Sequence, residues 1–251
     1  MSSSVLPYRI FSLGDTAITV DFGNVINEHV NKVVIARFNE LIKYPLPGMT
    51  EAVPAYSSFT VYYDIVSVKR KAGNDMVAFE WMKQQLEARL LQPASEEVLA
   101  ERRQEMNERR VRIPVCYDDE FALDIYRVAG AKNISVDELV QIHTSRAYKV
   151  YMLGFLPGFA YMGEVEEKIA VPRKPQPVGI PAGSVGIAGK QTGIYPLASP
   201  GGWQIIGRTP VKLFDAEKKQ PTLLQAGDIV EFYAISKTDF TNMQNETVSQ
   251  V

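Results

Sequence analysis

Cysteine and histidine are both scarce in this chain of 251 residues. Cys116 is the only cysteine, and His29 and His143 are the only histidines. A single cysteine excludes a disulfide within the chain, and a structural zinc site usually takes four cysteine or histidine ligands. We therefore expect neither a disulfide framework nor a resident metal.

A basic surplus and a long apolar run are absent as well. The 27 lysines and arginines are matched by 29 aspartates and glutamates, which gives a formal charge of −2. Nucleic-acid-binding proteins normally concentrate basic charge on one face, so this balance argues against a nucleic-acid partner. No apolar run approaches the roughly 20 residues that cross a bilayer, and the first residues lack the basic-then-apolar order of a secretory signal. The sequence predicts a cytoplasmic protein with no membrane partner.

The hydrophobic fraction of 46% allows a substantial core, and residues 1–95 predict a small α/β domain. A helix is expected to begin near Asn27, because apolar residues then recur at three- and four-residue steps. A second helix is expected at residues 75–90, with Asn74 as its N-cap. Alternating or β-branched runs predict three strands, at residues 9–13, 17–22 and 59–63.

Residues 96–110 mix acidic and basic side chains, so they are interpreted as a charged connector.

Residues 111–240 predict a second domain, in which 11 of the 17 glycines and 8 of the 15 prolines lie between positions 154 and 210, interleaved with apolar residues. Short strands joined by tight turns fit that pattern best, as in a small closed β-barrel. Ser135 and Glu138 form a capping box that starts a helix. Residues 241–251 are expected to be a polar tail.

Three runs rich in glycine and proline are candidates for a binding site, and each has a structural alternative. The first spans residues 154–163. Its aromatic side chains and its Pro-Gly turn can wall a pocket for a small planar substrate, or they can fill the core of a barrel. Its candidate residues are Phe155, Pro157, Gly158, Phe159 and Tyr161.

The second run, residues 171–185, holds Arg173 between prolines. A fixed guanidinium loses less entropy when it grips an anion, although a lone arginine beside a turn is more often a surface residue. Gly183 and Ser184 can present backbone N–H groups and a hydroxyl to an oxyanion, or they can form a β-bulge.

The third run, residues 195–210, begins with Tyr195 and contains Trp203. Its paired glycines, Gly201 and Gly202, let a backbone approach a ligand closely, because no Cβ intervenes. Arg208 is a second candidate anion clamp. Two arginines beside one glycine-rich wall would suit a carboxylate or a phosphate.

His143 is the one plausible acid–base histidine, because its ordinary pKa lies near neutrality. A lone histidine near a helix end more often caps the helix or packs in the core. His29 falls in a first helical turn and is assigned no chemistry. The residues by themselves predict a pocket but no particular reaction.

Taken together, these runs resemble one family closely, the 5-oxoprolinase B-subunit family, which is also described as KipI-like or as allophanate hydrolase subunit 1. The resemblance extends over nearly the whole chain. Its matching elements are Gly14-Asp15-Thr16-Ala17, Phe22-Gly23, residues 53–58, residues 113–117, His143, the three runs and Gly227-Asp228.

The resemblance implies an α+β protein, with a small N-terminal α/β domain followed by a C-terminal cyclophilin-like β-barrel. It also implies kinship with the carboxyltransferase domain of urea carboxylase, in its subdomains C and D. The B subunits of this family pair directly with a C subunit to make a shared site, and they work with an A subunit as well to convert 5-oxoproline to glutamate at the expense of ATP. The chain has no biotin-carrier segment and no full nucleotide motif, so ATP with magnesium is expected only at the level of the complex.

The resemblance further implies roles for the candidate residues. Arg173 and Arg208 would bind the substrate carboxylate or a transferring phosphoryl group. Backbone groups around Gly183-Ser184 and Gly201-Gly202 would hold developing negative charge, and His143 would move a proton. The residues that would orient the substrate ring are Tyr161, Gln191 and Tyr195.

Two further functions remain open at this point. Some relatives are inhibitors that bind a sporulation histidine kinase, as KipI does, and such a protein would carry no chemistry of its own. The other alternative is a carboxyltransferase-like subunit that acts on urea or another amide.

Overall fold

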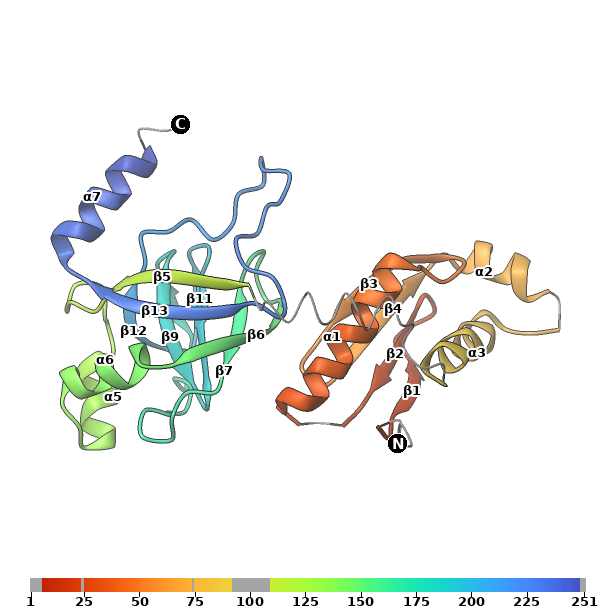
Figure 1. The fold of residues 1–251 in the computed structure, drawn as a ribbon, viewed down its shortest axis with the longest axis horizontal. Helices are drawn as coiled ribbons and strands as arrows, with labels where there is room; N and C mark the ends of the chain where they lie inside the picture. Colours follow the sequence, from red (N-terminus) through yellow and green to blue (C-terminus); the bar gives the residue numbers. More distant parts are fainter. Residues whose placement is uncertain (1–5, 24, 74, 92–108, 249–251) are drawn as a thin grey trace. The chain divides into compact units, whose positions relative to one another are not determined.

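The structure is a computed structural model that describes residues 6–23, 25–73, 75–91 and 109–248. The chain divides into two compact units, Met1–Asn107 and Glu108–Val251, each with a hydrophobic core of its own. Figure 1 traces the elements of both units along the sequence. Most of the connector expected at residues 96–110 lies outside the described residues.

The N-terminal unit is built on a four-stranded antiparallel sheet with the order β1-β2-β4-β3. Side chains alternate across each strand, so Ile18, Val20, Phe59 and Val61 share the core face. The helices bury their apolar stripes in the same core. The elements are β1 (Arg9–Ser12), β2 (Ala17–Asp21), α1 (Glu28–Lys43), β3 (Met49–Pro54), β4 (Ser58–Tyr63), α2 (Ile65–Ala72) and α3 (Ala78–Leu91).

The first helix begins as predicted, because the side chain of Asn27 accepts the backbone N–H of Val30 at 3.1 Å. Strand β3 and helix α2 were not predicted. The first residues of α2 are β-prone, yet the carboxylate of Asp64 accepts the backbone N–H of Ser67 at 2.6 Å and starts a helix there. The second predicted helix begins at Ala78 and not at residue 75; its expected cap, Asn74, lies outside the described residues.

Seven strands of the C-terminal unit close into a barrel, which confirms the predicted α+β class with an N-terminal α/β domain and a C-terminal β-barrel. The barrel order is β10-β7-β6-β13-β5-β12-β9. Strands β5 and β13 run parallel, and the other neighbours are antiparallel. The strands are β5 (Arg110–Cys116), β6 (Ala147–Leu153), β7 (Ala160–Gly163), β9 (Ser184–Ala188), β10 (Gln191–Ile194), β12 (Gln204–Arg208) and β13 (Ile229–Ile235).

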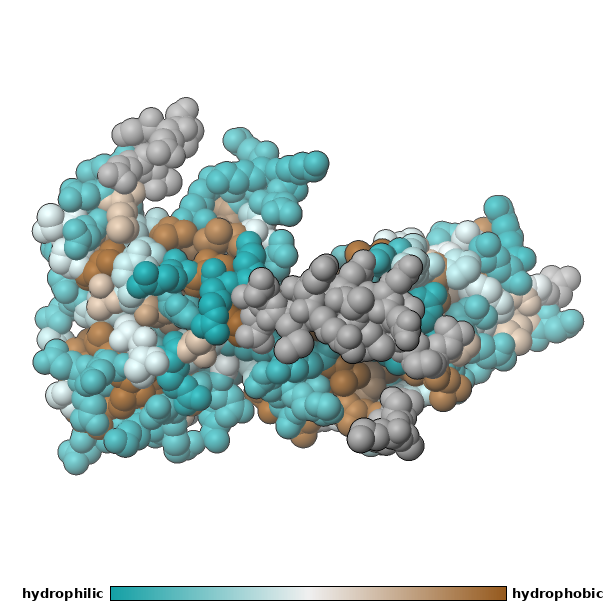
Figure 2. Space-filling view, viewed as in Figure 1, coloured by the Kyte–Doolittle hydropathy of each residue, from teal (hydrophilic) through white to brown (hydrophobic). Residues whose placement is uncertain are grey.

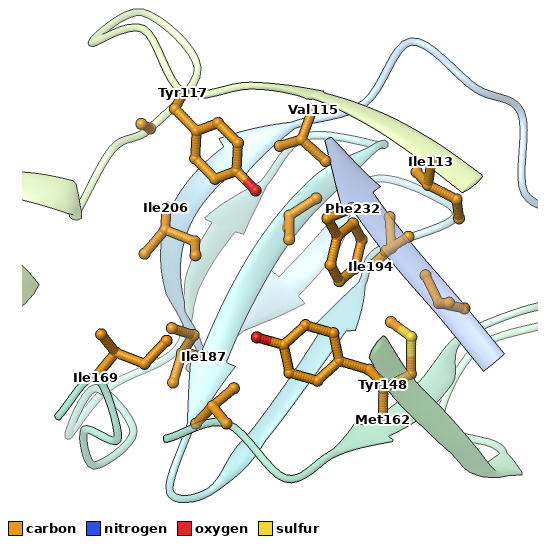
Figure 3. Packing of buried hydrophobic residues seen from close by; sticks show 14 of the residues in the cluster. Ile113, Val115, Tyr117, Tyr148, Met162, Ile169, Ile187, Ile194, Ile206 and Phe232 are labelled. Carbon is orange, nitrogen blue, oxygen red and sulfur yellow. The ribbon is translucent and has the colours of Figure 1, made fainter. Parts of the chain in front are cut away.

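Large apolar side chains fill the barrel interior, as Figure 3 shows. Alternate residues of each strand point inward, and Ile113, Tyr148, Ile187 and Ile206 are fully buried. Each such side chain contributes roughly 1.5–3 kcal/mol when it leaves water. The positions between them face outward and can build a site.

Two helices and a small sheet surround the barrel. Helix α5 (Ile125–Lys132) precedes α6 (Val136–Thr144), and the predicted cap of α6 is confirmed, because the hydroxyl of Ser135 accepts the backbone N–H of Glu138 at 3.0 Å. Strands β8 (Val178–Ile180) and β11 (Ser199–Gly201) pair separately. Of the helices that the structure describes, none combines the length and apolar character needed to cross a membrane.

The chain after Ile235 forms a helix, α7 (Lys237–Val248), which includes residues 241–248 of the expected polar tail. Ser236 and Asp239 cap this helix, since the backbone N–H of Asp239 donates to the Ser236 hydroxyl at 3.1 Å. Phe240 is only 2% exposed, and its ring centroid lies 4.3 Å from that of Phe121. One aromatic anchor therefore holds an otherwise polar helix against the barrel domain.

Candidate functional site

A cluster of aromatic side chains lies on the outer face of the barrel, over β9 and β10. Phe159 stands at its centre, with its ring centroid 5.4 Å from that of Trp203, 5.2 Å from that of Tyr195 and 4.8 Å from that of Tyr161. All three pairs are edge-to-face, the arrangement that the charge distribution of aromatic rings favours. We call Phe155, Phe159, Tyr161, Tyr195 and Trp203 the aromatic shelf.

Two glycines make room for the shelf. Gly186 of β9 pairs with Gly193 of β10, so the outer face of the sheet carries no side chain at either position. A Cβ on Gly193 would lie 3.0 Å from Cζ3 of Trp203 and 3.1 Å from Cζ of Phe159, and a Cβ on Gly186 would lie 3.1 Å from Cβ of Trp203. The rings therefore rest directly on the backbone, which only glycine allows.

Arg173 is exposed at the edge of the shelf. Its guanidinium carbon lies 5.9 Å from the ring centroid of Trp203, within the range of a cation–π contact. The positive charge also acts on Tyr161 and Tyr195, because it opposes the rise of both their pKa values. Of the two predicted anion clamps, Arg173 is the one that the structure brings to the aromatic residues.

The two shelf tyrosines keep their protons at neutral pH. Burial raises the pKa of Tyr161 and of Tyr195 above the ordinary phenol value, and the charge of Arg173 offsets only part of that rise. A protonated phenol can donate one hydrogen bond and accept others. The shelf therefore combines flat apolar rings with one permanent positive charge and two neutral phenols, of which only that of Tyr161 is partly exposed.

The segment that carries Arg173 is clamped by its neighbour Lys174. The backbone N–H of Lys174 donates to the carbonyl of Gly202 at 2.6 Å. Its ammonium lies 2.6 Å from the carboxylate of Asp124, and both side chains are nearly buried. An anchored backbone on both sides reduces the entropy that Arg173 loses when it binds an anion.

A second set of contacts holds the other side of Arg173. The side-chain amide of Gln204 donates to the carbonyl of Pro172 at 3.0 Å. Gln204 in turn accepts a hydrogen bond from Arg127 on α5. Strand β12, helix α5 and the Arg173 segment are thus tied into one network.

The first glycine–proline run forms the exposed rim of the shelf. Phe155 has a φ of +69° and is 61% exposed, and its ring packs edge-on against Phe159 at 5.6 Å. A bulky residue in the left-handed region is strained, and such strain is concentrated at functional sites. Pro157 is exposed, whereas Gly158 is buried with a φ of +81°, and a Cβ there would lie 3.0 Å from Cβ of Phe214.

Gly201 and Gly202 lie on the Arg173 side of the shelf. A Cβ on Gly201 would overlap the phenol of Tyr195, so glycine is required for packing at this position. Gly202 contributes its carbonyl to Lys174, as described above. Gln191 is partly buried at the start of β10, on the same outer face as Gly193, two residues away.

Gly183 and Ser184 do not present free backbone donors. The N–H of Gly183 donates to the carbonyl of Tyr195 at 2.7 Å, and that of Ser184 donates to the carbonyl of Pro181 at 3.3 Å. Gly183 has a φ of +82° and lies tightly against Thr209. These contacts favour a role in turning the chain, the structural alternative that the sequence left open.

Arg208 lies away from Arg173. Its Nε donates to the carbonyl of Ala182 at 2.7 Å, and its guanidinium carbon lies 6.0 Å from the ring centroid of Phe240 on α7. Trp203 and Arg208 are five residues apart along an extended segment, a span of roughly 15 Å. The contacts of Arg208 with Ala182 and Phe240 involve neither Arg173 nor a residue of the aromatic shelf.

His143 is fully buried inside the barrel, where its ring stacks on Phe232 with centroids 4.7 Å apart. The hydroxyl of Thr192 donates to the carbonyl of Gly186, so it accepts from Nε2 of His143 at 3.0 Å. Nδ1 then accepts from the phenol of Tyr117 at 2.8 Å. Burial lowers the pKa of His143 to about 3. The ring is neutral and fully satisfied, which favours packing over proton transfer at the surface.

Two open grooves lie elsewhere on the C-terminal unit. One, of about 910 Å³, runs beside α6 and contains Tyr117, Val140 and Ile235. The other, of about 530 Å³, contains Arg112, Arg146 and Tyr233. Neither includes a residue of the aromatic shelf.

Among the residues that the structure describes, no group of three or more histidine, cysteine, aspartate or glutamate side chains is placed to hold a metal ion.

Several residues of the site were missed by the sequence analysis. Asp124 gives no local signal, because its partner Lys174 lies 50 positions away. The two glycines beneath the aromatic shelf do have a detectable signal in the sequence. Gly186 and Gly193 each stand between two β-branched residues, in Val-Gly-Ile and Thr-Gly-Ile. Isolated glycines within strand patterns indicate a close approach of another group.

Comparisons with known proteins identify relatives along the whole chain. Residues 8–224 match the family described as carboxyltransferase domain, subdomain C and D. The B subunit of 5-oxoprolinase from Bacillus subtilis (strain 168) is 46% identical over 96% of this chain and 98% of its own length. The protein of the same description from Escherichia coli O157:H7 is 34% identical over 89% of this chain and 94% of its own.

Two solved structures share the fold. The crystal structure of TTHA0988 matches with a TM-score of 0.72 at 34% identity, over 88% of this chain; the match spans only 40% of that longer chain. The urea carboxylase of Kluyveromyces lactis matches with a TM-score of 0.70 over 95% of this chain and 23% of its own. At 18% identity, this second likeness shows the fold alone.

Proposed function

Because the chain belongs to the 5-oxoprolinase B-subunit family, within the carboxyltransferase subdomain C and D family, we propose that it is the B subunit of an ATP-dependent 5-oxoprolinase. The complex converts 5-oxoproline to glutamate in the cytoplasm. Its other components are the A and C subunits, and ATP with magnesium binds at the level of the complex. The observation that carries the proposed site is Arg173, held over Trp203 at the edge of the aromatic shelf.

The chemistry of the shelf suits 5-oxoproline, a flat five-membered lactam that carries one carboxylate. The guanidinium of Arg173 binds that carboxylate through two parallel hydrogen bonds. The lactam ring then lies against Phe155, the exposed ring of the shelf, and beside the partly exposed Tyr161. Because the Arg173 segment is clamped through Lys174 and Asp124, the anchor point is fixed before the substrate arrives.

One neutral phenol of the shelf acts on the amide of the lactam. Tyr161 has a raised pKa and is partly exposed, so its phenol can donate a hydrogen bond to the carbonyl oxygen, whereas Tyr195 is 1% exposed and supports the other rings by packing. A lactam resists hydrolysis because its amide is resonance-stabilised, and ATP supplies the phosphoryl group that activates the carbonyl oxygen. The role of this chain is to bind, orient and polarise the substrate.

The open rim explains why the chain needs partners. Phe155 and Arg173 are both exposed, so a bound substrate would remain in contact with water. Water weakens a charge-assisted hydrogen bond and allows side reactions. In our proposal a partner protein covers the shelf and completes the site, so the chain alone is inactive.

The first experiment measures ATP hydrolysis that depends on 5-oxoproline, together with glutamate release. The purified chain is combined with its own A and C subunits, and the reaction is repeated with this chain omitted. Loss of activity on omission supports the proposal. Activity that persists without the chain contradicts the proposal. Turnover of urea or another amide in place of 5-oxoproline would show that the complex acts on a different substrate.

The site is tested in the reconstituted complex with Arg173→Ala. We expect kcat/KM for 5-oxoproline to fall about 10- to 100-fold, because a hydrogen bond to a charged group contributes roughly 1.5–3 kcal/mol. Arg70→Ala, an exposed arginine on α2, is the matched control and should change nothing. An Arg173→Ala complex with full activity would exclude the shelf as the carboxylate site.

A further inference from the structure

The seam between α6 and β13 forms a continuous trough on the C-terminal unit. The grooves of about 910 Å³ and about 530 Å³ share Thr144 and Ala234, so they adjoin end to end. The first lies along α6, and the second follows β13 past the end of that helix. In Figure 2, strongly hydrophilic side chains lie beside apolar ones on the face that β5, β13 and β6 form in Figure 1.

One end of the trough is acidic. Its walls carry four carboxylates and one ammonium, which gives a formal charge of −3. The ammonium of Lys237 is paired with Glu120, and the phenol of Tyr126 donates to Asp119 at 2.7 Å. Neither contact neutralises the excess, so this end attracts cations. The carboxylates belong to Asp118, Asp119, Glu120 and Asp137.

The other end is basic. Arg112 stacks on the ring of Tyr233, with its guanidinium carbon 4.9 Å from the centroid, and Arg146 makes a partly exposed contact with Glu166 at 3.8 Å. Glu231, the acidic residue of this groove, is paired with Arg110. The two arginines are therefore left to define the charge of this end.

The floor between the charged ends is apolar. Val136 and Val140 of α6 and Ile235 of β13 line the trough and are partly buried, and they pack on the barrel core and on the cluster around Phe240. Helix α6 has nine residues, so it separates the ends by roughly 13 Å. A small metabolite does not reach across this distance, but a short stretch of polypeptide does.

We propose that this trough docks a segment of a partner polypeptide, with apolar side chains on the floor, lysine or arginine at the acidic end, and aspartate or glutamate at the basic end. Such a pattern fixes the direction of the segment, because reversing it would place like charges together. The identity of the partner rests on the proposed function, in which the A and C subunits bind this chain. The trough shares no residue with the aromatic shelf, so the docked segment does not itself occupy the shelf.

The test measures the affinity of the chain for its purified A and C subunits by calorimetry. The variants are Asp119→Asn with Glu120→Gln at one end, and Arg112→Gln with Arg146→Gln at the other. We expect each pair to weaken binding at least tenfold and to flatten the dependence on salt between about 50 and 300 mM, since exposed charges are screened over about 10 Å at 0.1 M. The matched control, Glu51→Gln with Glu217→Gln, removes two exposed carboxylates elsewhere.

A photo-cross-linking residue in place of Gln141, which is exposed in the trough, locates the contact independently of affinity. We expect it to capture one of the two partners, whereas the same residue at Glu217 captures neither. Wild-type affinity in both trough variants, with no cross-link from position 141, would overturn the docking proposal and leave the proposed function intact. Failure of the wild-type chain to bind either partner would refute the proposed function itself, and the docking proposal with it.

Discussion

The carboxylate of Asp124 and the ammonium of Lys174 lie 2.6 Å apart, with side chains that are 13% and 10% exposed. Asp124 occupies the N-cap position of α5 but makes no capping hydrogen bond. Its carboxylate accepts the backbone N–H of Ile205 at 2.7 Å instead. One acidic residue thus ties a helix, strand β12 and the Arg173 segment together.

The ion pair predicts a coupled effect on stability and on activity. Asp124→Asn leaves the nearly buried ammonium of Lys174 without its counter-charge, so we expect a loss of about 3 kcal/mol in the free energy of unfolding. KM for 5-oxoproline should also rise, because the Arg173 segment loses an anchor. Denaturant unfolding and steady-state kinetics of the complex measure the two effects.

A double-mutant cycle with Lys174→Met is the control for this pair. Removing both partners should cost less than the sum of the two single changes. Lys212→Met, which breaks the exposed pair with Asp215, should change little. Strict additivity in the cycle would show that Asp124 and Lys174 are not coupled.

Because the rings of the aromatic shelf rest directly on Gly186 and Gly193, we expect an added methyl group at either glycine to overpack the shelf. Gly193→Ala places a Cβ 3.0 Å from Cζ3 of Trp203, and we expect a loss of about 1–3 kcal/mol in stability. The emission of Trp203 should shift as the ring is displaced, and a Trp81→Phe background isolates that signal. Gly179→Ala is the matched control, since nothing lies within 4 Å of its Cβ. Equal stability of the two alanine variants would show that the rings of the shelf do not rest on Gly193.

The buried histidine predicts a dependence of stability on pH. The pKa of His143 is about 3 in the folded chain and about 6.5 when unfolded, so the unfolded state binds more protons between these values. The contribution of His143 to the free energy of unfolding should therefore be fully present above about pH 6.5 and fall by about 1.4 kcal/mol per pH unit below it. His143→Gln should remove this slope between about pH 4.5 and 6.5, whereas His29→Gln, at an exposed histidine, should keep it. An unchanged slope in His143→Gln would show that His143 is not the group responsible.

Helix α7 predicts a contribution to stability from the C-terminal segment. Phe240→Ala removes a ring that is 2% exposed and packs on Phe121. We expect a cost of about 3–4 kcal/mol, because a large core side chain leaves a cavity that refills only in part. Gln244→Ala, at an exposed position of the same helix, is the control. If Phe240→Ala unfolds at the same denaturant concentration as the wild type, α7 is not anchored to the barrel.

Local patterns in the sequence account for the elements that were predicted well. The apolar stripe after Asn27 and the capping box at Ser135 each involve residues within one or two turns of one another, so neighbouring positions suffice to indicate a helix. The two helices that the sequence did not predict, α2 and α7, also have an explanation in their local sequence. The residues of α2 are β-prone, and α7 has one buried aromatic in a polar surrounding, so neither shows a helical stripe.

The sequence by itself determined the α+β class, the barrel-forming run of glycines and prolines, and the aromatic and arginine residues of the candidate site. These follow from residue type and short spacing, which a chain displays before it folds. Only the tertiary structure decided that Arg173 joins the aromatic shelf while Arg208 packs on Phe240 and His143 lies inside the barrel. Barrel closure brings together strands that are far apart in sequence and turns alternate residues inward or outward, so the register of distant strands selects which polar groups meet.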